Sequence, residues 1–167
     1  MGLSLPLPVG GYQKLPESVY EKIDWKKQVL DQPHGYMVCC TLEVPEHLHE
    51  ALESFPPAPE KMDIAYKDLS PYAKEALKTF SKYPEEYKAQ KLVGTLGVKE
   101  EYFCHYMNLK LYLELGLTIK KVHSVTQFNQ ERIFQPYINK TMELRREAKS
   151  KFKSNIWKKM NNACYVW

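Results

Sequence analysis

The sequence predicts an α+β fold, with antiparallel strands followed by a long C-terminal helix. Three observations support this. Apolar runs of strand length are bounded by Gly or Pro, other segments have a helical period, and residues 141–164 contain neither Pro nor Gly. The chain has 167 residues, of which 44% are hydrophobic and 26% charged, as is typical of a globular domain. It has no apolar run of ~18 residues and no secretory signal pattern, so we expect an intracellular protein without membrane contact, with the nucleus and a viral replication site both left open.

The first half of the chain contains one strongly predicted strand. Residues 35–45 are apolar and β-branched and lie between a Gly and a Pro, which predicts a buried strand. Ser70 is an N-cap residue directly before Pro71, so a helix is expected to begin there and run through Phe80. The other expected elements are an extended loop over 5–12, a short amphipathic segment over 16–29, a short helix over 46–53, a proline-rich loop over 55–59 and a polar exposed segment over 82–90.

The second half predicts two more strands and two helices. Strands are expected over 102–106 and 118–128, with a helix over 109–115 that stops at Gly116. Thr141 is the expected N-cap of one helix of some 24 residues. On this helix Leu144, Ala148, Phe152, Ile156 and Met160 form an apolar ridge at i, i+4 spacing that would seat it on the rest of the protein.

Positive charge is concentrated in the last element. The chain carries a net charge of +4, and residues 141–167 contain seven basic and two acidic residues. The preceding 140 residues contain 17 basic and 18 acidic residues, a net charge of −1. This asymmetry is expected for a polyanion-binding face, and a solvated helix surface is the plain alternative.

A polar stripe follows the same helix. At 3.6 residues per turn, Lys151, Lys158, Asn162 and Tyr165 fall within about 60° of one another. Ammonium groups can neutralise a triphosphate and an aromatic ring can stack on a base, so the stripe has a use in nucleotidyl transfer. An ordinary surface stripe is the alternative.

The spacing of Lys158, Asn162 and Tyr165 resembles the K-x-x-x-N-S-x-Y-G motif of family B DNA polymerases, with Ala163 in the Ser place and Val166 in the Gly place. Upstream segments resemble the region before that motif in protein-primed polymerases of Polinton (Maverick) mobile elements and related viruses. These segments are 43–49, 58–61, 105–113, 116–117, 120–123, 136–138 and 145–149. The resemblance covers about residues 5–165.

The resemblance implies a partial polymerase palm with an insertion region over 1–140 and a truncated, basic fingers helix over 141–167. It implies a DNA-directed DNA polymerase that transfers dNTPs onto DNA in protein-primed replication, with template and primer DNA, dNTPs and a terminal protein as partners. Lys158, Asn162 and Tyr165 would bind the nucleotide. Triphosphate or DNA backbone would be contacted by Arg145, Arg146, Lys149 and Lys151.

The chain departs from the family at the metal-binding motifs. The family holds Mg²⁺ with carboxylates that lie before and after the segment matched here, so we expect a fragment that carries no catalytic residue, binds no metal and is inactive alone. Val166 is a second departure, because a β-branched residue replaces Gly at the helix end. A non-catalytic nucleic-acid-binding module that uses only the basic helix, and an inert, poorly folded product, are the alternatives.

The remaining candidate sites are weak. His47 and His49 are two residues apart and do not share a helix face, and His105 and His123 lie on separate predicted strands, so no metal cluster is expected. Glu43 and Asp63 are isolated carboxylates. Gly94 and Gly97 lack the ending of a phosphate-binding loop. Cysteines 39, 40, 104 and 164 have no metal or disulfide spacing and are expected to be buried free thiols in a reducing compartment.

Overall fold

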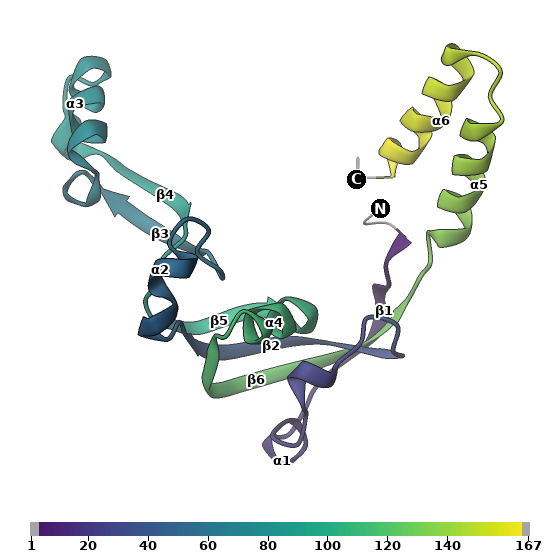
Figure 1. Ribbon diagram of the computed structural model, residues 1–167, viewed down its shortest axis with the longest axis horizontal. Coiled ribbons are helices and arrows are strands. Elements are labelled where there is room, and N and C mark those ends of the chain that lie inside the picture. Colours follow the sequence, from purple (N-terminus) through teal and green to yellow (C-terminus); the bar gives the residue numbers. More distant parts are fainter. Residues whose placement is uncertain (1–3, 165–167) are drawn as a thin grey trace. The chain divides into compact units, whose positions relative to one another are not determined.

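Antiparallel strands and helices make up the structure, a computed structural model that describes residues 4–164 (Figure 1). The fold class is α+β, as predicted. The strands are β1 (Leu7–Lys14), β2 (His34–Glu43), β3 (Glu60–Ala65), β4 (Lys88–Val93), β5 (Lys99–His105) and β6 (Thr118–Glu131). The α-helices are α1 (Glu17–Tyr20), α2 (His49–Leu52), α3 (Pro71–Phe80), α4 (Tyr106–Glu114), α5 (Gln135–Arg146) and α6 (Lys151–Ala163). Short 3-10 turns are η2 (Trp25–Lys27), η3 (Glu46–Leu48), η4 (Tyr66–Asp68) and η5 (Pro84–Glu86).

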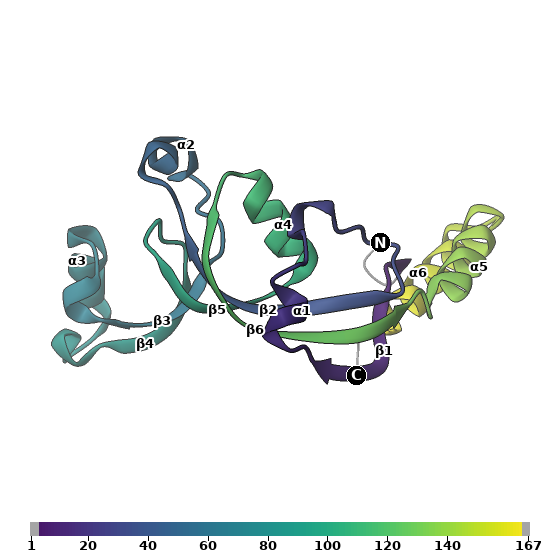
Figure 2. The same ribbon diagram turned by 90° about the horizontal axis from the view of Figure 1, so that it is seen from below.

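The main sheet has four strands in the order β1-β6-β2-β5, and β3 and β4 form a separate two-stranded sheet (Figure 2). By contact the chain divides into two compact units. The first contains the residues up to 37, residues 105–107 and those from 124 onward, and the second contains residues 38–104 and 108–123. Each unit has its own buried core.

The core of the first unit is aromatic. The ring of Tyr36 lies edge-on to Trp25 and to Tyr106, with ring centroids 5.8 and 5.9 Å apart. The fully buried Tyr106 accepts a hydrogen bond from Gln130 Nε2 at 3.0 Å and donates to the carbonyl of Val29 at 3.1 Å. The polar tip of this large side chain is therefore satisfied inside the core.

The core of the second unit is aliphatic. It includes Val38, Cys40 and Leu42 of β2, which alternate along the strand and are fully buried, together with Leu109 and Leu113 of α4. The strand predicted over 35–45 is confirmed as β2 (His34–Glu43), in which Val38, Cys40 and Leu42 share one side and are buried. Gly116 ends the α4 segment with φ +99°, as predicted, and a Cβ there would lie 2.6 Å from Leu48 Cδ1.

The loop predicted over 5–12 is wrong for most of its length, because β1 lies there. β1 pairs antiparallel with β6 from Leu7↔Glu131 to Lys14↔Thr126, with register shifts around Gly10. A strand that contains Pro8 is tolerated because β1 is at the edge of the sheet, where one side needs no hydrogen-bonding partner. Gly10 and Gly11 have positive φ and absorb the shifts.

The β3–β4 hairpin was not predicted. It pairs in regular register from Glu60↔Val93 to Ala65↔Lys88. None of its strand residues is fully buried, and the apolar alternation of Met62 and Ile64 is too short to reveal a strand. The helix between the strands was predicted correctly: α3 begins at Pro71, and Ser70 Oγ accepts a hydrogen bond from the Ala73 amide at 3.2 Å.

Candidate functional site

The basic C-terminal element is a helical hairpin, where the sequence predicted one helix. α5 ends at Arg146, and α6 begins after Ser150, whose Oγ accepts a hydrogen bond from the Lys153 amide at 3.3 Å. Ser150 has extended backbone (φ −133°, ψ 148°), so the helix is interrupted and restarted there. The sequence prediction missed this N-cap because residues 141–164 contain no Pro or Gly that would mark a break in the helix.

Thr141 is not the N-cap that the sequence predicted. It lies inside α5 and is 3% exposed, with its hydroxyl 3.0 Å from the carbonyl of Tyr137. The same hydroxyl hydrogen-bonds Asn161 Oδ1 of α6, and Tyr137 OH donates to the Met160 carbonyl at 3.2 Å. These two bonds join α5 and α6 side by side (Figure 1).

The apolar ridge predicted to seat this helix does not do so along α6. Phe152 is 74% exposed, and Ile156 and Met160 are each 39% exposed. The half-buried residues of α6 are Ser154, Trp157 and Asn161, and the C-cap residue Cys164 is half-buried too. Trp157 and Asn161 each follow a ridge residue by one position, which turns the packed side by about 100°. On this side the hydroxyl of the buried Thr141 hydrogen-bonds the half-buried Asn161, which favours packing of this side because a buried hydroxyl without a partner would cost free energy.

Lys158 and Asn162 are brought together on the exposed part of α6. They are four residues apart, so they lie about one turn from each other on one side of the helix. Both line a shallow depression of about 450 Å³, together with Phe152, Asn155, Ile156 and Lys159. Tyr165 and Val166 lie outside the described residues. Of the stripe predicted to bind a nucleotide, Lys151, Lys158 and Asn162 therefore lie together on α6.

The four predicted phosphate-contacting residues gather where α5 passes into α6. Arg145 and Arg146 end α5, Lys149 lies in the connection and Lys151 begins α6, and all four are exposed. Lys151 is seven residues before Lys158, which corresponds to about 10 Å along the helix. The two fall within about 20° of each other around the axis. Arg145, Arg146, Lys149 and Lys151 thus form a cationic tip of the hairpin. The Lys158–Asn162 pair lies farther along α6, on the same side as Lys151.

The charge of the hairpin is largely uncompensated. Residues 135–164 contain eight basic and two acidic residues, a net charge of +6. In the described part of the chain, the hairpin has a single ion pair, Lys140–Glu143 at 3.2 Å. Exposed cations without internal partners are free to bind an anion, and their field attracts polyanions. Lys158 and Lys159 belong to this set.

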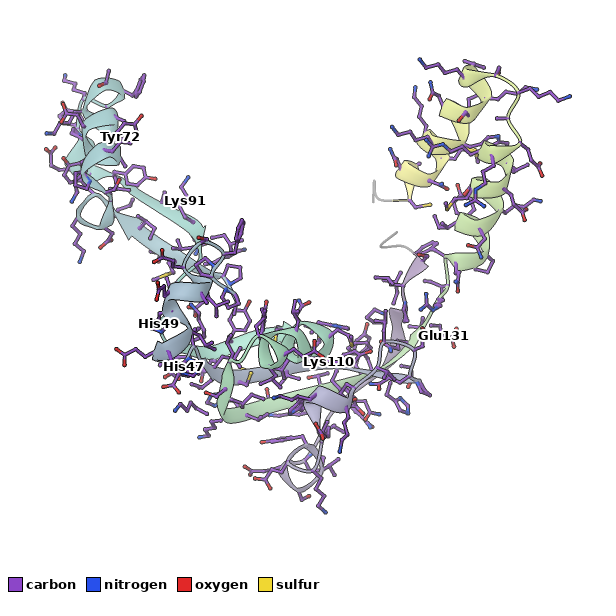
Figure 3. All side chains as sticks on the ribbon, viewed as in Figure 1. His47, His49, Tyr72, Lys91, Lys110 and Glu131 are labelled. Carbon is purple, nitrogen blue, oxygen red and sulfur yellow. The ribbon has the colours of Figure 1, made fainter. Side chains whose placement is uncertain are left out.

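Of the two histidines near residue 48, His49 has a structural role. His49 Nε2 lies 3.0 Å from the Val44 carbonyl, so its ring secures the chain that follows β2, and His47 lies in η3 just before it (Figure 3). Within residues 4–164, no group of three or more His, Cys, Asp or Glu side chains could hold a metal ion. None of the helices described there is long and apolar enough to cross a membrane.

Glu43, predicted to be a surface carboxylate without a partner at catalytic spacing, forms an ion pair with a lysine. It lies 2.5 Å from Lys120 Nζ and accepts a hydrogen bond from Thr118, and the Lys120 hydrogen bond lowers the pKa of its carboxyl below the usual range. Among the cysteines, Cys40 and Cys104 are buried. The hydrogen bond with Cys104, together with burial, raises the pKa of the Cys40 thiol.

Sequence reasoning missed a polar network across three strands. Thr41 of β2 donates to Glu100 Oε2 of β5 at 2.9 Å and lies 2.8 Å from His123 Nε2 of β6. Because the hydroxyl has one proton, His123 Nε2 must carry the hydrogen in its own bond to Thr41. The only sequence signal was Thr41 itself, a polar residue inside the apolar run 35–45.

Comparisons with known proteins do not assign the site. No protein-family model, curated protein or solved structure matches the chain.

Proposed function

We propose that this chain is part of a DNA-directed DNA polymerase of the protein-primed family B type and supplies its nucleotide-binding helix. The observation that carries the proposal is the Lys158–Asn162 pair, adjacent on the exposed side of α6. The sequence resemblance gives that pair its role. Dividing the predicted helix in two leaves the proposal intact, because both residues lie within α6.

Lys158 is suited to a triphosphate. Its ammonium is exposed, has no ion-pair partner among the described residues, and can donate charge-assisted hydrogen bonds to phosphate oxygens. Asn162, one turn farther on, offers an amide donor and an amide acceptor that could hydrogen-bond a sugar or base. The cationic tip would bind additional phosphates of the nucleotide or of DNA.

The described residues do not fit the Mg²⁺ that such a polymerase requires. They contain no cluster of carboxylates that could hold an ion. Catalysis by the parent polymerase would therefore depend on carboxylates that the resemblance places in other motifs. What this chain contributes is binding and orientation of the nucleotide.

Binding of a nucleotide tests the role of Lys158. Full-length chain should bind dTTP, and Lys158→Ala should weaken that binding by roughly tenfold, since a charge-assisted hydrogen bond is lost. The matched control is Lys91→Ala on β4, which removes a lysine from an exposed strand position (Figure 3). Equal affinity of the wild type and Lys158→Ala for dTTP would contradict the proposal.

Primer extension adds a second test. With Mg²⁺, a primed template and dNTPs, the chain alone should yield no extended product, and extension that persists after repurification would refute the proposed division of roles.

A nucleic-acid-binding module is the second candidate, and the net charge of +6 on residues 135–164 favours it. Such a module would bind single-stranded DNA with an affinity that falls steeply as salt rises. It would show no measurable affinity for dTTP. Replacing Lys151, Lys158 and Lys159 together with Ala should then abolish DNA binding, and unchanged binding would exclude the module.

A further inference from the structure

Phe152 is the least explained side chain of the hairpin. It occupies the second position of α6, belongs to the ridge that the sequence expects to be buried, and is 74% exposed. A Phe ring in water loses the free energy that burial would provide. The residues next to the ring indicate which kind of ligand could cover it.

The ring lies at one end of the depression on α6. Asn155, Ile156 and Lys159 follow Phe152 at steps of three, four and seven, so they line the same side of the helix next to the ring. The depression thus combines an aromatic face, an aliphatic side chain, side-chain amides and two ammonium groups. No carboxylate lines it.

This combination fits a nucleobase attached to phosphate. An aromatic ring stacks on any base, and lysines beside it meet the backbone phosphates. The net charge of +6 on residues 135–164 provides charge complementarity to a nucleic acid and repels a basic protein surface. Lys151, the member of the cationic tip next to Phe152, and the other three cations of the tip could bind further phosphates of the same strand.

We propose that Phe152 is a stacking platform for an unpaired base of single-stranded nucleic acid, with Lys158 and Lys159 on the neighbouring phosphates. The proposal rests on the proposed function, because it assumes that α6 faces nucleic acid or nucleotide. It adds a residue outside the Lys158, Asn162 and Tyr165 stripe. It also gives the exposed ridge a binding role that its spacing alone did not suggest.

Two oligomers with identical phosphates test the stacking. The full chain is titrated with fluorescently labelled dT12 and with a 12-mer of abasic sites, at one fixed salt concentration. The wild type should prefer dT12 by at least about fivefold. Phe152→Leu keeps an apolar side chain but removes the ring, so it should abolish the preference while leaving affinity for the abasic strand within about twofold.

The matched control is Phe80→Leu. Phe80 is 86% exposed at the end of α3, in the other unit, and its replacement should leave the preference for dT12 unchanged. Circular dichroism melting of each variant establishes that it is folded. A preference for dT12 that survives Phe152→Leu overturns the stacking proposal.

The failure of this inference is distinguishable from failure of the proposed function. If both oligomers bind equally and Lys158→Ala with Lys159→Ala weakens both, α6 binds phosphate and Phe152 does not stack. If neither oligomer nor dTTP binds, both proposals fail. A preference lost only in Phe152→Leu supports the stacking platform.

Discussion

Polar groups of the sheet and polar groups of the helical hairpin are used differently. In the sheet, Thr41 joins Glu100 and His123 across three strands, and Glu43 pairs with Lys120. On α6, Lys158 and Lys159 form no ion pair with any described residue. The contrast teaches that the fold neutralises particular charges within the sheet and leaves the lysines of α6 available to an anion.

The largest expected change in stability comes from replacing Lys99 of β5, a sheet lysine whose charge is paired. Its side chain is fully buried, and its ammonium lies 2.8 Å from the Thr95 carbonyl and 3.2 Å from Glu60 Oε2. Lys99→Ala should lower the free energy of unfolding by about 3 kcal/mol, at the low end for a broken buried ion pair because Glu60 is 26% exposed. Urea denaturation measures it.

The control for Lys99 is Lys61→Ala on β3. Lys61 is exposed, so this change should alter the free energy of unfolding by less than about 0.5 kcal/mol. Equal losses in the two variants would show that Lys99 is not the buried cation that the structure describes.

Trp157 and Phe152 give an intermediate effect and test which side of α6 packs. Trp157 is half-buried on the side where Asn161 meets Thr141, so Trp157→Ala should cost about 2 kcal/mol. Phe152→Ala should cost less than about 0.5 kcal/mol because that ring is exposed. Thermal unfolding compares them. The reverse order would restore the ridge predicted from the sequence as the packed side.

His105 gives the smallest effect. Burial lowers the pKa of its imidazole below the usual 6.5, so the unfolded chain binds the proton more readily than the folded chain. Stability should therefore be constant above about pH 7.5 and decline as the pH falls through 6.5. Comparing urea midpoints between pH 8 and pH 5 for the wild type and His105→Gln measures it, and an unchanged slope in the variant would assign the acid sensitivity elsewhere.

Local sequence signals predicted the elements that have their own apolar side or cap. The run that became β2 has alternating buried residues, and α3 begins where Ser70 and Pro71 placed it. β1 was missed because an edge strand can contain Pro8 and Gly10. The β3–β4 hairpin was missed because none of its strand residues is fully buried. Both missed elements consist of strands that are held by hydrogen bonds to a partner strand and contribute few buried side chains to a core.

The candidate site was predicted in part. Helical spacing alone was enough to place Lys158 beside Asn162, and the structure has both on α6. The division of the predicted helix at Ser150 was not foreseen, since a Ser can be tolerated within a helix as well as cap one. Binding of a nucleotide by this pair stays a prediction.

By itself, the sequence determined the concentration of positive charge near the C-terminus and the one-turn spacing of Lys158 and Asn162. Both follow from composition and from helix geometry, which are local properties. Only the tertiary structure decided which side of α6 is covered. An i, i+4 ridge shows that a helix has an apolar side, but the partner decides which side is packed, and here the Thr141–Asn161 bond and Trp157 turn Phe152 to solvent.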